Sequence, residues 1–174
     1  AKKIDVNAAR ADGATALLWA AHWDDLEMAD LLLRAGARVN AADDYGVTAL
    51  ARASENASEA MVGKLLAAGA NPNAAQKSGL TPLMIAARTG NVQVVKAIVA
   101  KGANINATTE EANPTALMWS LALGHSAIIT TLIENGADVK ISTTKGFTPL
   151  MFAARNGDID VARPLVAKGA GVNQ

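Results

Sequence analysis

The sequence predicts an all-α fold, in which pairs of short antiparallel helices stack in line as a solenoid and are joined by hairpin-like excursions. A threonine recurs every 33 or 34 residues, at Thr15, Thr48, Thr81, Thr115 and Thr148. Each is followed 21 residues later by the first residue of a Gly-Ala pair, at Gly36, Gly69, Gly102, Gly136 and Gly169. A period of this length indicates an array of stacked repeats, in which each unit buries its apolar face against its neighbours.

Residues 81–106 show how the sequence encodes one unit. Thr81 followed by Pro82 is a typical helix start, because the threonine side chain caps free N–H groups and proline suits the first turn. Gly90 ends this apolar stretch, and a second apolar stretch over residues 92–99 ends before Gly102. Two short helices and then an extended excursion are therefore expected. Isolated helices this short are marginal in water, so each pair depends on its neighbours.

The sequence TPLMIAARTGNVQVVKAIVAKGANIN of residues 81–106, and the spacing of its equivalents, resemble the ankyrin repeat. The resemblance covers nearly the whole chain and implies a single array over residues 1–174, with repeats at 9–41, 42–74, 75–108, 109–141 and 142–174. Residues 1–8 read as the tail of a preceding unit, so we expect a part of a longer array. A fold this widely used does not identify the partner.

Four places depart from the pattern. Asp24 stands where later units have the glycine that ends the first helix, and aspartate tolerates a left-handed conformation at small cost. Ala57 stands there in the second repeat, and alanine is poorly suited to a left-handed conformation. We therefore expect either that Asn56 takes this conformation or that the turn is shifted, and that the second repeat is less stable. One residue is inserted within 108–114, where the excursion is expected to be longer and more mobile. Pro164 falls inside the last helix, where a proline costs about 3 kcal/mol of helix stability. We expect this helix to be kinked.

The Thr-Pro-Leu-His tetrapeptide that is common in the ankyrin family lacks its histidine in every repeat. Its place is taken by Leu18, Ala51, Met84, Met118 and Met151. We expect apolar packing between neighbouring repeats to replace the hydrogen bond that the family makes between threonine and histidine. Methionine is an adaptable filler, so these residues are interpreted as packing rather than as a functional cluster.

The composition limits the class of partner. Hydrophobic residues make up 51% of the 174 residues and aromatic residues only 3%, so we expect a core of Ala, Leu and Val. Basic and acidic residues number 16 each, and this balance argues against binding nucleic acid or an anionic membrane. No apolar run approaches the roughly 20 residues of a membrane span. We expect a soluble monomer; the lack of a signal-peptide hydrophobic region favours the cytoplasm but leaves the compartment open.

The sequence offers no candidate for catalysis. There is no cysteine, and the two histidines, His22 and His125, belong to no Ser-His-Asp constellation and no metal-ligand spacing. Asp24 and Asp25 near His22 read as acidic residues at a helix N-terminus, which the helix dipole favours. A glycine-rich phosphate-binding loop is also missing. We therefore expect no enzymatic activity, no cofactor and no metal site.

The outward face of each first helix is the candidate binding surface. The leucine two places after each threonine, such as Leu83, is expected to be buried. At about 100° per residue, the places four, seven and eight after the threonine lie on the opposite side of the helix, and Ile85 holds one of them. In ankyrin proteins this face and the excursion tips form a concave groove, which the resemblance implies here. The six aromatic residues all fall on these places or in the excursions. The candidate binding residues are Trp19, His22, Trp23, Tyr45, Glu55, Arg88, Trp119, Leu123, Phe147, Phe152 and Arg155.

Two interpretations of this surface stay open. Aromatic residues in a groove carry binding energy as a few large anchors, which favours a protein or peptide as partner. Trp19, Trp119 and Phe152 are equally compatible with packing of the groove floor, and the alternative is an architectural or engineered-type scaffold array with no dedicated ligand. Exposure of Trp23 and Tyr45 would favour binding, whereas burial of all six aromatics would favour the scaffold.

Charge divides the groove along its length. Asp12, Asp43, Asp44 and Glu55 flank the N-terminal aromatics, which predicts a basic partner segment there, held by cation–π contacts and carboxylate pairing. A methylated-lysine cage, of the kind some ankyrin domains build, is a narrower alternative. Solvated rim charge, which tunes binding rate more than affinity, is the alternative for most of these residues. The charges that follow are Lys77, Arg88, Glu110, Glu111, Lys145 and Arg155.

Overall fold

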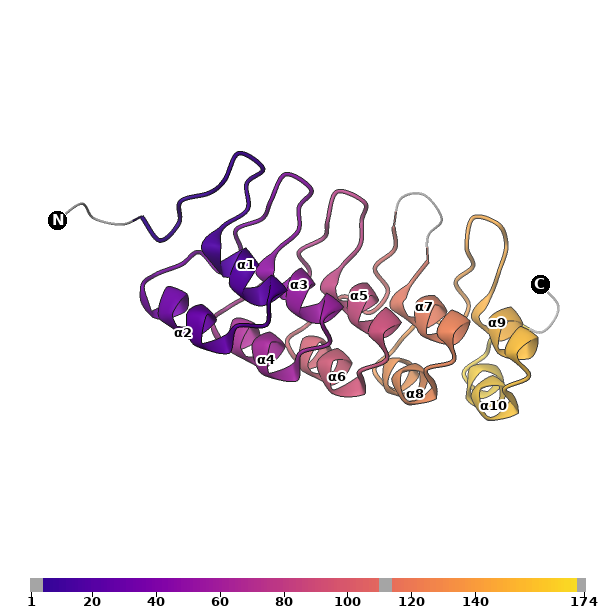
Figure 1. The fold of residues 1–174 in the computed structure, drawn as a ribbon. Helices are drawn as coiled ribbons and strands as arrows, with labels where there is room; N and C mark the ends of the chain where they lie inside the picture. Colours follow the sequence, from indigo (N-terminus) through magenta and orange to yellow (C-terminus); the bar gives the residue numbers. More distant parts are fainter. Residues whose placement is uncertain (1–4, 110–113, 172–174) are drawn as a thin grey trace.

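The computed structural model describes residues 5–109 and 114–171, and that part of the chain forms ten helices in five pairs (Figure 1). The first helices of the pairs are α1 (Ala16–His22), α3 (Ala49–Glu55), α5 (Pro82–Thr89), α7 (Ala116–Leu123) and α9 (Pro149–Asn156). The second helices are α2 (Leu26–Arg34), α4 (Glu59–Ala67), α6 (Val92–Ala100), α8 (Ser126–Glu134) and α10 (Ile159–Ala167). The described residues contain two isolated β-bridges and no strand, so the all-α prediction is confirmed.

The helices form two layers, and the excursions form a third (Figure 1). The first helices lie side by side in chain order, and the second helices follow the same order beneath them. The excursions project together beyond the first helices, away from the second ones. Each first helix contacts the first helix of the next pair, from α1 with α3 to α7 with α9, and the second helices from α4 to α10 do the same. The stack is therefore continuous along the described chain, as a solenoid requires.

Each first helix begins after the threonine that the sequence marks. The hydroxyl of Thr81 accepts a hydrogen bond from the backbone N–H of Met84 at 3.3 Å, and Pro82 occupies the first turn. The equivalent threonines cap α1, α3, α7 and α9 in the same way. His125, before α8, makes no side-chain cap bond. The other second helices are capped by Asp25, Ser58, Asn91 and Asp158.

The turn between α3 and α4 differs from the expectation. Ala57 itself has a positive φ of 53°, whereas Asn56 has an αR conformation at φ −75°. The turn is therefore not shifted, and Ala57 rather than Asn56 takes the left-handed conformation. The side chain of Asn56 is used for a contact between repeats. Its Nδ2 donates to the carbonyl oxygens of Ala21 and His22 in the preceding repeat, at 3.0 and 2.8 Å. Asp24 takes the left-handed conformation as expected, at φ 55°.

Replacing Ala57 by glycine is expected to stabilise the protein by about 1 kcal/mol, because a left-handed backbone costs alanine roughly 1–2 kcal/mol and glycine little. Ala60→Gly is the matched control: Ala60 is exposed inside α4 and should lose about 1 kcal/mol. Urea unfolding followed by circular dichroism measures both free energies. A loss of stability in Ala57→Gly would show that this turn carries no strain.

Two further departures concern the C-terminal part of the chain. Helix α10 continues through Pro164 to Ala167, so the proline does not end the helix. The expected kink there stays a prediction. The inserted residue falls within 108–114, and residues 110–113, on which a longer and more mobile excursion was expected, lie outside the described residues.

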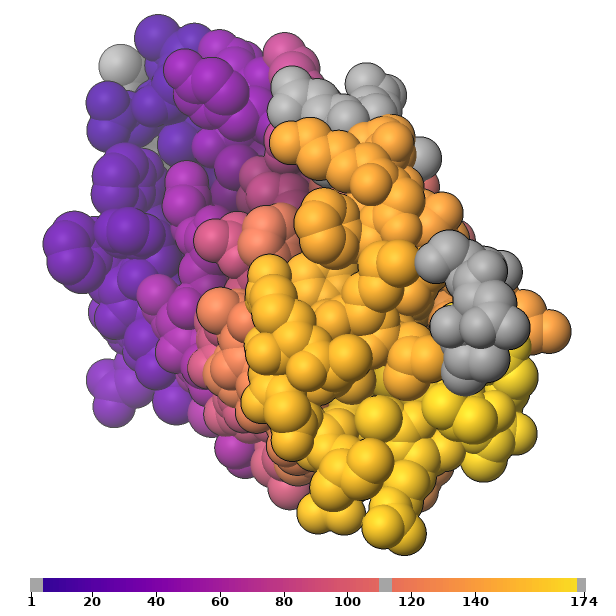
Figure 2. Space-filling view, turned by 90° about the vertical axis from the view of Figure 1, so that its right-hand side faces the viewer, coloured from indigo at the N-terminus to yellow at the C-terminus, as the bar shows by residue number. Residues whose placement is uncertain are grey.

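The residues that replace the family's histidine pack between repeats, except in the last one. Leu18, Ala51, Met84 and Met118 are at most 5% exposed, whereas Met151 is 40% exposed. The first four belong to repeats that another helix pair follows, whereas within the described residues no pair lies beyond α9 and α10. Figure 2 looks onto this end of the stack, and Ile159 and Val166 of its last helix, α10, are also exposed. The expected apolar packing is thus confirmed for the inner joints.

An asparagine near the end of a repeat links it to the next. Nδ2 of Asn40 donates to the carbonyl of Gly69 at 3.1 Å, and its Oδ1 accepts from the backbone N–H of Asn71 at 2.7 Å. Lys140 holds the equivalent place in the fourth repeat, where its side chain, a donor without an acceptor, cannot make both bonds. We call these bonds the asparagine ladder. The other residues that make the same pair of bonds are Asn7, Asn73 and Asn106.

Candidate functional site

The first three excursions are held beside one another by their backbones. The N–H of Asp44 donates to the carbonyl of Asp12, and the N–H of Lys77 donates to the carbonyl of Tyr45, both at 2.9 Å. At Gly46, with φ 79°, a Cβ atom would lie 3.1 Å from the backbone nitrogen of Lys77, so glycine permits this close approach. The excursions therefore form a wall beside the outward face of the first helices.

Helix α1 and its C-cap carry a row of three exposed aromatic side chains. The ring of His22 lies 5.5 Å from that of Trp19 and 4.8 Å from that of Trp23, both edge to face. Trp23 is 73% exposed, and Tyr45, on the second excursion, is 72% exposed. A hollow of about 240 Å³ lies between α1 and the excursions. It is lined by Asp12, Ala14, Leu18, Trp19, His22, Asp43, Tyr45 and Arg52.

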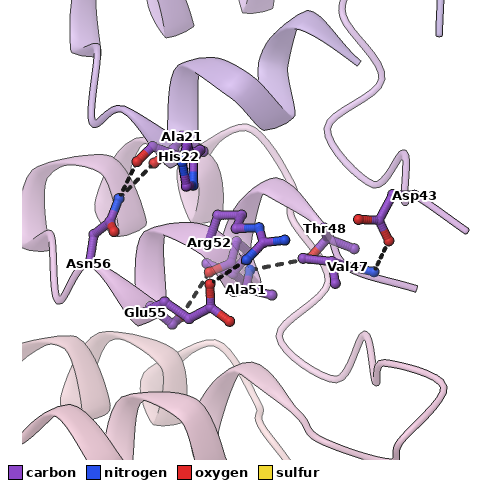
Figure 3. A network of polar contacts seen from close by, with 11 residues as sticks. Ala21, His22, Asp43, Val47, Thr48, Ala51, Arg52, Glu55 and Asn56 are labelled. Carbon is purple, nitrogen blue, oxygen red and sulfur yellow. Dashed lines mark hydrogen bonds and ion pairs between the residues drawn. The ribbon is translucent and has the colours of Figure 1, made fainter. Parts of the chain in front are cut away.

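The carboxylates at this end are partly engaged by the protein itself (Figure 3). Oδ1 of Asp43 accepts hydrogen bonds from the backbone N–H groups of Tyr45 and Val47, both at 2.9 Å. Glu55 accepts a hydrogen bond from Nη1 of Arg52 at 2.8 Å on the same helix. These acids are therefore only partly available to a partner.

Arg10 and Arg52 line this part of the groove but are absent from the predicted site residues. The guanidinium of Arg10 stands over the ring of Trp19, 5.7 Å from its centroid, and lies 3.8 Å from Asp12. The ring face of Trp19 thus already holds a cation. Arg52 and Glu55 are three residues apart on one helix, so their pairing could have been predicted from the sequence. The contact of Arg10 with Trp19 could not, because it depends on how the excursion folds.

Four of the candidate binding residues lie together in the middle of the groove: Glu55, Arg88, Trp119 and Leu123. They come from three consecutive first helices, α3, α5 and α7. The guanidinium of Arg88 stands over the ring of Trp119, 4.8 Å from its centroid. The indole N–H of Trp119 is shielded from solvent and has no acceptor among the described residues. These side chains line a hollow of about 490 Å³ together with Leu80, Ile85 and Thr89.

The prediction that Ile85 faces solvent is wrong. Ile85 is 4% exposed and packs with Val47, Ala51 and Leu80. Helical phase placed it on the outward side, but apolar residues at the bases of the excursions, Val47 and Leu80, cover it. The exposed strip of the first helices is therefore narrower than their helical phase predicts.

The C-terminal part of the groove brings together Phe147, Phe152 and Arg155. The two phenylalanine rings lie 5.9 Å apart, and the guanidinium of Arg155 stands 5.0 Å from the centroid of Phe152. Phe147 is exposed on the last excursion, and Phe152 is half-buried on α9. The predicted site residues thus form three groups along the stack rather than one patch. Glu110 and Glu111, predicted between the second and third groups, lie outside the described residues.

Neither histidine takes part in a catalytic constellation among the described residues. His22 belongs to the aromatic row, and Nε2 of His125 lies 3.3 Å from the carbonyl oxygen of Arg88, a contact across a repeat joint. No cluster of three or more His, Cys, Asp or Glu in residues 5–109 and 114–171 is placed to hold a metal ion. The helices of that same part are too short or too polar to cross a membrane.

A family model for ankyrin repeats (3 copies) matches residues 2–76, 40–109, 57–143 and 98–174. The chain belongs to the ankyrin repeat family. The ten helices agree with the five repeats that the sequence predicts. Ankyrin repeats are generally protein–protein interaction modules, and the family is generally non-catalytic.

Three curated proteins share part of this ankyrin array. The palmitoyltransferase AKR1 of Saccharomyces cerevisiae is 38% identical over 56 residues, which is 32% of this chain and 7% of that protein. The ankyrin repeat and KH domain-containing protein 1 of Homo sapiens is 38% identical over 67 residues, 38% of this chain and 2% of that protein. Its Drosophila melanogaster counterpart by name, mask, is 39% identical over 67 residues, with the same coverage. The chain thus spans a small fraction of these relatives, and the similarity to the palmitoyltransferase is carried by the repeats alone.

Proposed function

We propose that this ankyrin array is a non-catalytic module that binds another protein or a peptide along the groove between its first helices and its excursions. The observation that carries the proposal is the exposure of Trp23 and Tyr45. Side chains this exposed add little to core packing, and Trp and Tyr are the residue types that most often dominate binding energy at interfaces. We also propose that residues 1–174 form a single array with the repeat boundaries given above.

The partner is proposed to present a basic residue at the N-terminal end of the groove. The hollow beside α1 has aromatic rings from Trp19, His22 and Tyr45, with the carboxylates of Asp12 and Asp43 at its edge. A cation over an aromatic ring is attracted by the ring's negative face, and the Arg10 side chain already uses Trp19 in this way. Because Asp43 also holds its own loop, the rings are expected to give the larger part of the affinity.

An architectural scaffold with no dedicated ligand is the second candidate. It is favoured by Trp119 and Phe152, which are half-buried under guanidinium groups of the chain itself. These two rings need no partner to account for their positions. A scaffold role leaves Trp23 and Tyr45 without an explanation.

Selection of a displayed random-peptide library on the purified chain tests the proposal. We expect enriched peptides to carry Lys or Arg beside an aromatic or aliphatic residue. A synthetic peptide from this pool should bind the double variant Trp23→Ala plus Tyr45→Ala at least about 30-fold more weakly, as the loss of a binding hot spot of about 2 kcal/mol implies. Fluorescence anisotropy of the labelled peptide measures the two dissociation constants.

The matched control is the double variant Met28→Ala plus Leu31→Ala. Both side chains are large, apolar and exposed on α2, outside the groove. Peptide affinity should stay within about twofold of the unmodified chain, since these residues touch no part of the proposed site. Equal weakening of peptide binding by both double variants would show that the peptide does not bind specifically in the groove. If no peptide is enriched, the scaffold interpretation is preferred.

A further inference from the structure

The C-terminal half of the groove carries arginine side chains that are stacked on aromatic rings. Arg88 stands over Trp119 at 4.8 Å and Arg155 over Phe152 at 5.0 Å, measured from Cζ to ring centroid. Both arginines are exposed. A stacked guanidinium uses its flat face for the ring and keeps the N–H groups at its edge for hydrogen bonds. The rings therefore pre-position two strong donors on the groove surface.

The arginines in the two halves of the groove differ in their partners. In the N-terminal half, Arg10 lies beside Asp12 and Arg52 is bound to Glu55. Among the described residues, neither Arg88 nor Arg155 forms an ion pair. A further cation, Lys145, lies on the excursion before α9, whereas Lys77, on the excursion before α5, lies beside Tyr45, Arg52 and Glu55. Within the described residues, the guanidinium groups of Arg88 and Arg155 therefore have no carboxylate partner of their own.

The hollow beside Arg88 combines this charge with an apolar floor. Its apolar lining comes from Leu80, Ile85, Trp119 and Leu123, and Leu123 is 51% exposed. Glu55 also lines the hollow, but Arg52 already holds its carboxylate. The site thus offers burial for one large apolar side chain next to a guanidinium that has no ion-pair partner among the described residues.

We propose that the groove from α5 to α9 binds the acidic part of a peptide segment, in which Asp or Glu side chains flank a large apolar residue. The carboxylates pair with Arg88 and Arg155, because a carboxylate matches the guanidinium fork with two hydrogen bonds. The apolar residue enters the hollow at Trp119 and Leu123. This inference rests on the proposed function and adds a direction to it: the partner segment runs from basic to acidic along the array from α1 to α9.

Nuclear magnetic resonance of the three tryptophan indole N–H signals tests the inference on the full 174-residue chain. The probes are three pentapeptides with a central phenylalanine, flanked on both sides by two glutamates, two glutamines or two lysines. The Trp119 signal should respond to the acidic peptide with an affinity at least about tenfold higher than to the neutral one, a difference within reach of one charge-assisted pair. The basic peptide should instead move the signals of Trp19 and Trp23.

The double variant Arg88→Gln plus Arg155→Gln should abolish the preference of the Trp119 site for the acidic peptide over the neutral one. The matched control, Arg34→Gln plus Arg163→Gln, removes the same net charge from exposed positions on α2 and α10, outside the groove, and should keep the preference. Backbone amide spectra check that both variants are folded.

Three results would overturn the inference. The first is equal affinity of the acidic and neutral peptides at Trp119. This result would be compatible with binding in the groove but would show that the carboxylates of the peptide contribute nothing to it. The second is the same loss in the control variant, which assigns the effect to net charge. The third is no response of Trp119 to the acidic peptide at about 5 mM, a concentration that would fill most of a site with a dissociation constant near 1 mM. Failure of the proposed function is read separately, from Trp23→Ala plus Tyr45→Ala.

Discussion

Met61→Ala is expected to lower the free energy of unfolding by about 2–5 kcal/mol, and Met28→Ala by less than about 1 kcal/mol. Both methionines lie 13 residues after the threonine of their repeat. Met61 is 0% exposed on α4, which follows α2 and precedes α6 in the layer of second helices, whereas Met28 is 43% exposed on α2, the first helix of that layer in the described chain (Figure 1). Truncation therefore leaves a cavity at Met61 and little change at Met28.

Urea unfolding followed by circular dichroism measures the two free energies. Amide hydrogen exchange of α2 and α4 should accompany it, because a repeat array can open in parts rather than all at once. The comparison holds residue type and repeat position constant, so burial between neighbouring second helices is what differs. Similar losses in both variants would mean that stacking of the second helices is not a main source of stability.

The helix ends could be predicted from the sequence because they are encoded locally. A threonine hydroxyl reaches the N–H three residues ahead, as Thr81 does for Met84, and this needs no information from the rest of the chain. A glycine such as Gly90, at φ 84°, ends a helix for an equally local reason. Repetition of these signals at a fixed period then specified the stack.

Burial and turn strain could not be read from local signals alone. Ile85 has the helical phase of an outward residue but is covered by Val47 and Leu80, which come from the bases of two excursions. Ala57 takes a conformation that suits glycine, and the side chain of Asn56 is bound to carbonyls of the preceding repeat. Both outcomes depend on contacts between repeats, which the pattern within one repeat does not contain.

The positions of the candidate site could be predicted, but the partners of its charges could not. Periodicity placed Arg88 and Trp119 on the same face of consecutive repeats, as the structure confirms. That the guanidinium lies over the ring depends on the distance between the two helices and on side-chain rotamers. The same holds for Arg10, which the repeat pattern gave no reason to place over Trp19.

Asn73→Ala is expected to lower the free energy of unfolding by about 1–2 kcal/mol, since each of its two hydrogen bonds contributes roughly 0.5–1.5 kcal/mol and both are near the surface. Nδ2 of Asn73 donates to the carbonyl of Gly102 at 3.0 Å, and its Oδ1 accepts from the N–H of Asn104 at 2.7 Å. Asn104→Ala is the control, because among the described residues its side chain bonds only within its own loop, to the N–H of Asn106. It should cost about half as much. Urea unfolding compares the two variants.

Lys140→Asn is expected to act in the opposite direction on the last repeat. An asparagine there would face the carbonyl of Gly169 and the N–H of Gly171, the counterparts of Gly102 and Asn104, where the lysine side chain now lies against Gly169. Amide protection in α9 and α10 should rise about tenfold, which corresponds to roughly 1.4 kcal/mol of added local stability. If protection there is unchanged while Asn73→Ala still destabilises the chain, the asparagine bonds shape each loop but do not join the repeats. The stability of the last repeat would then depend more on the exposed face around Met151 than on the missing step in the asparagine ladder.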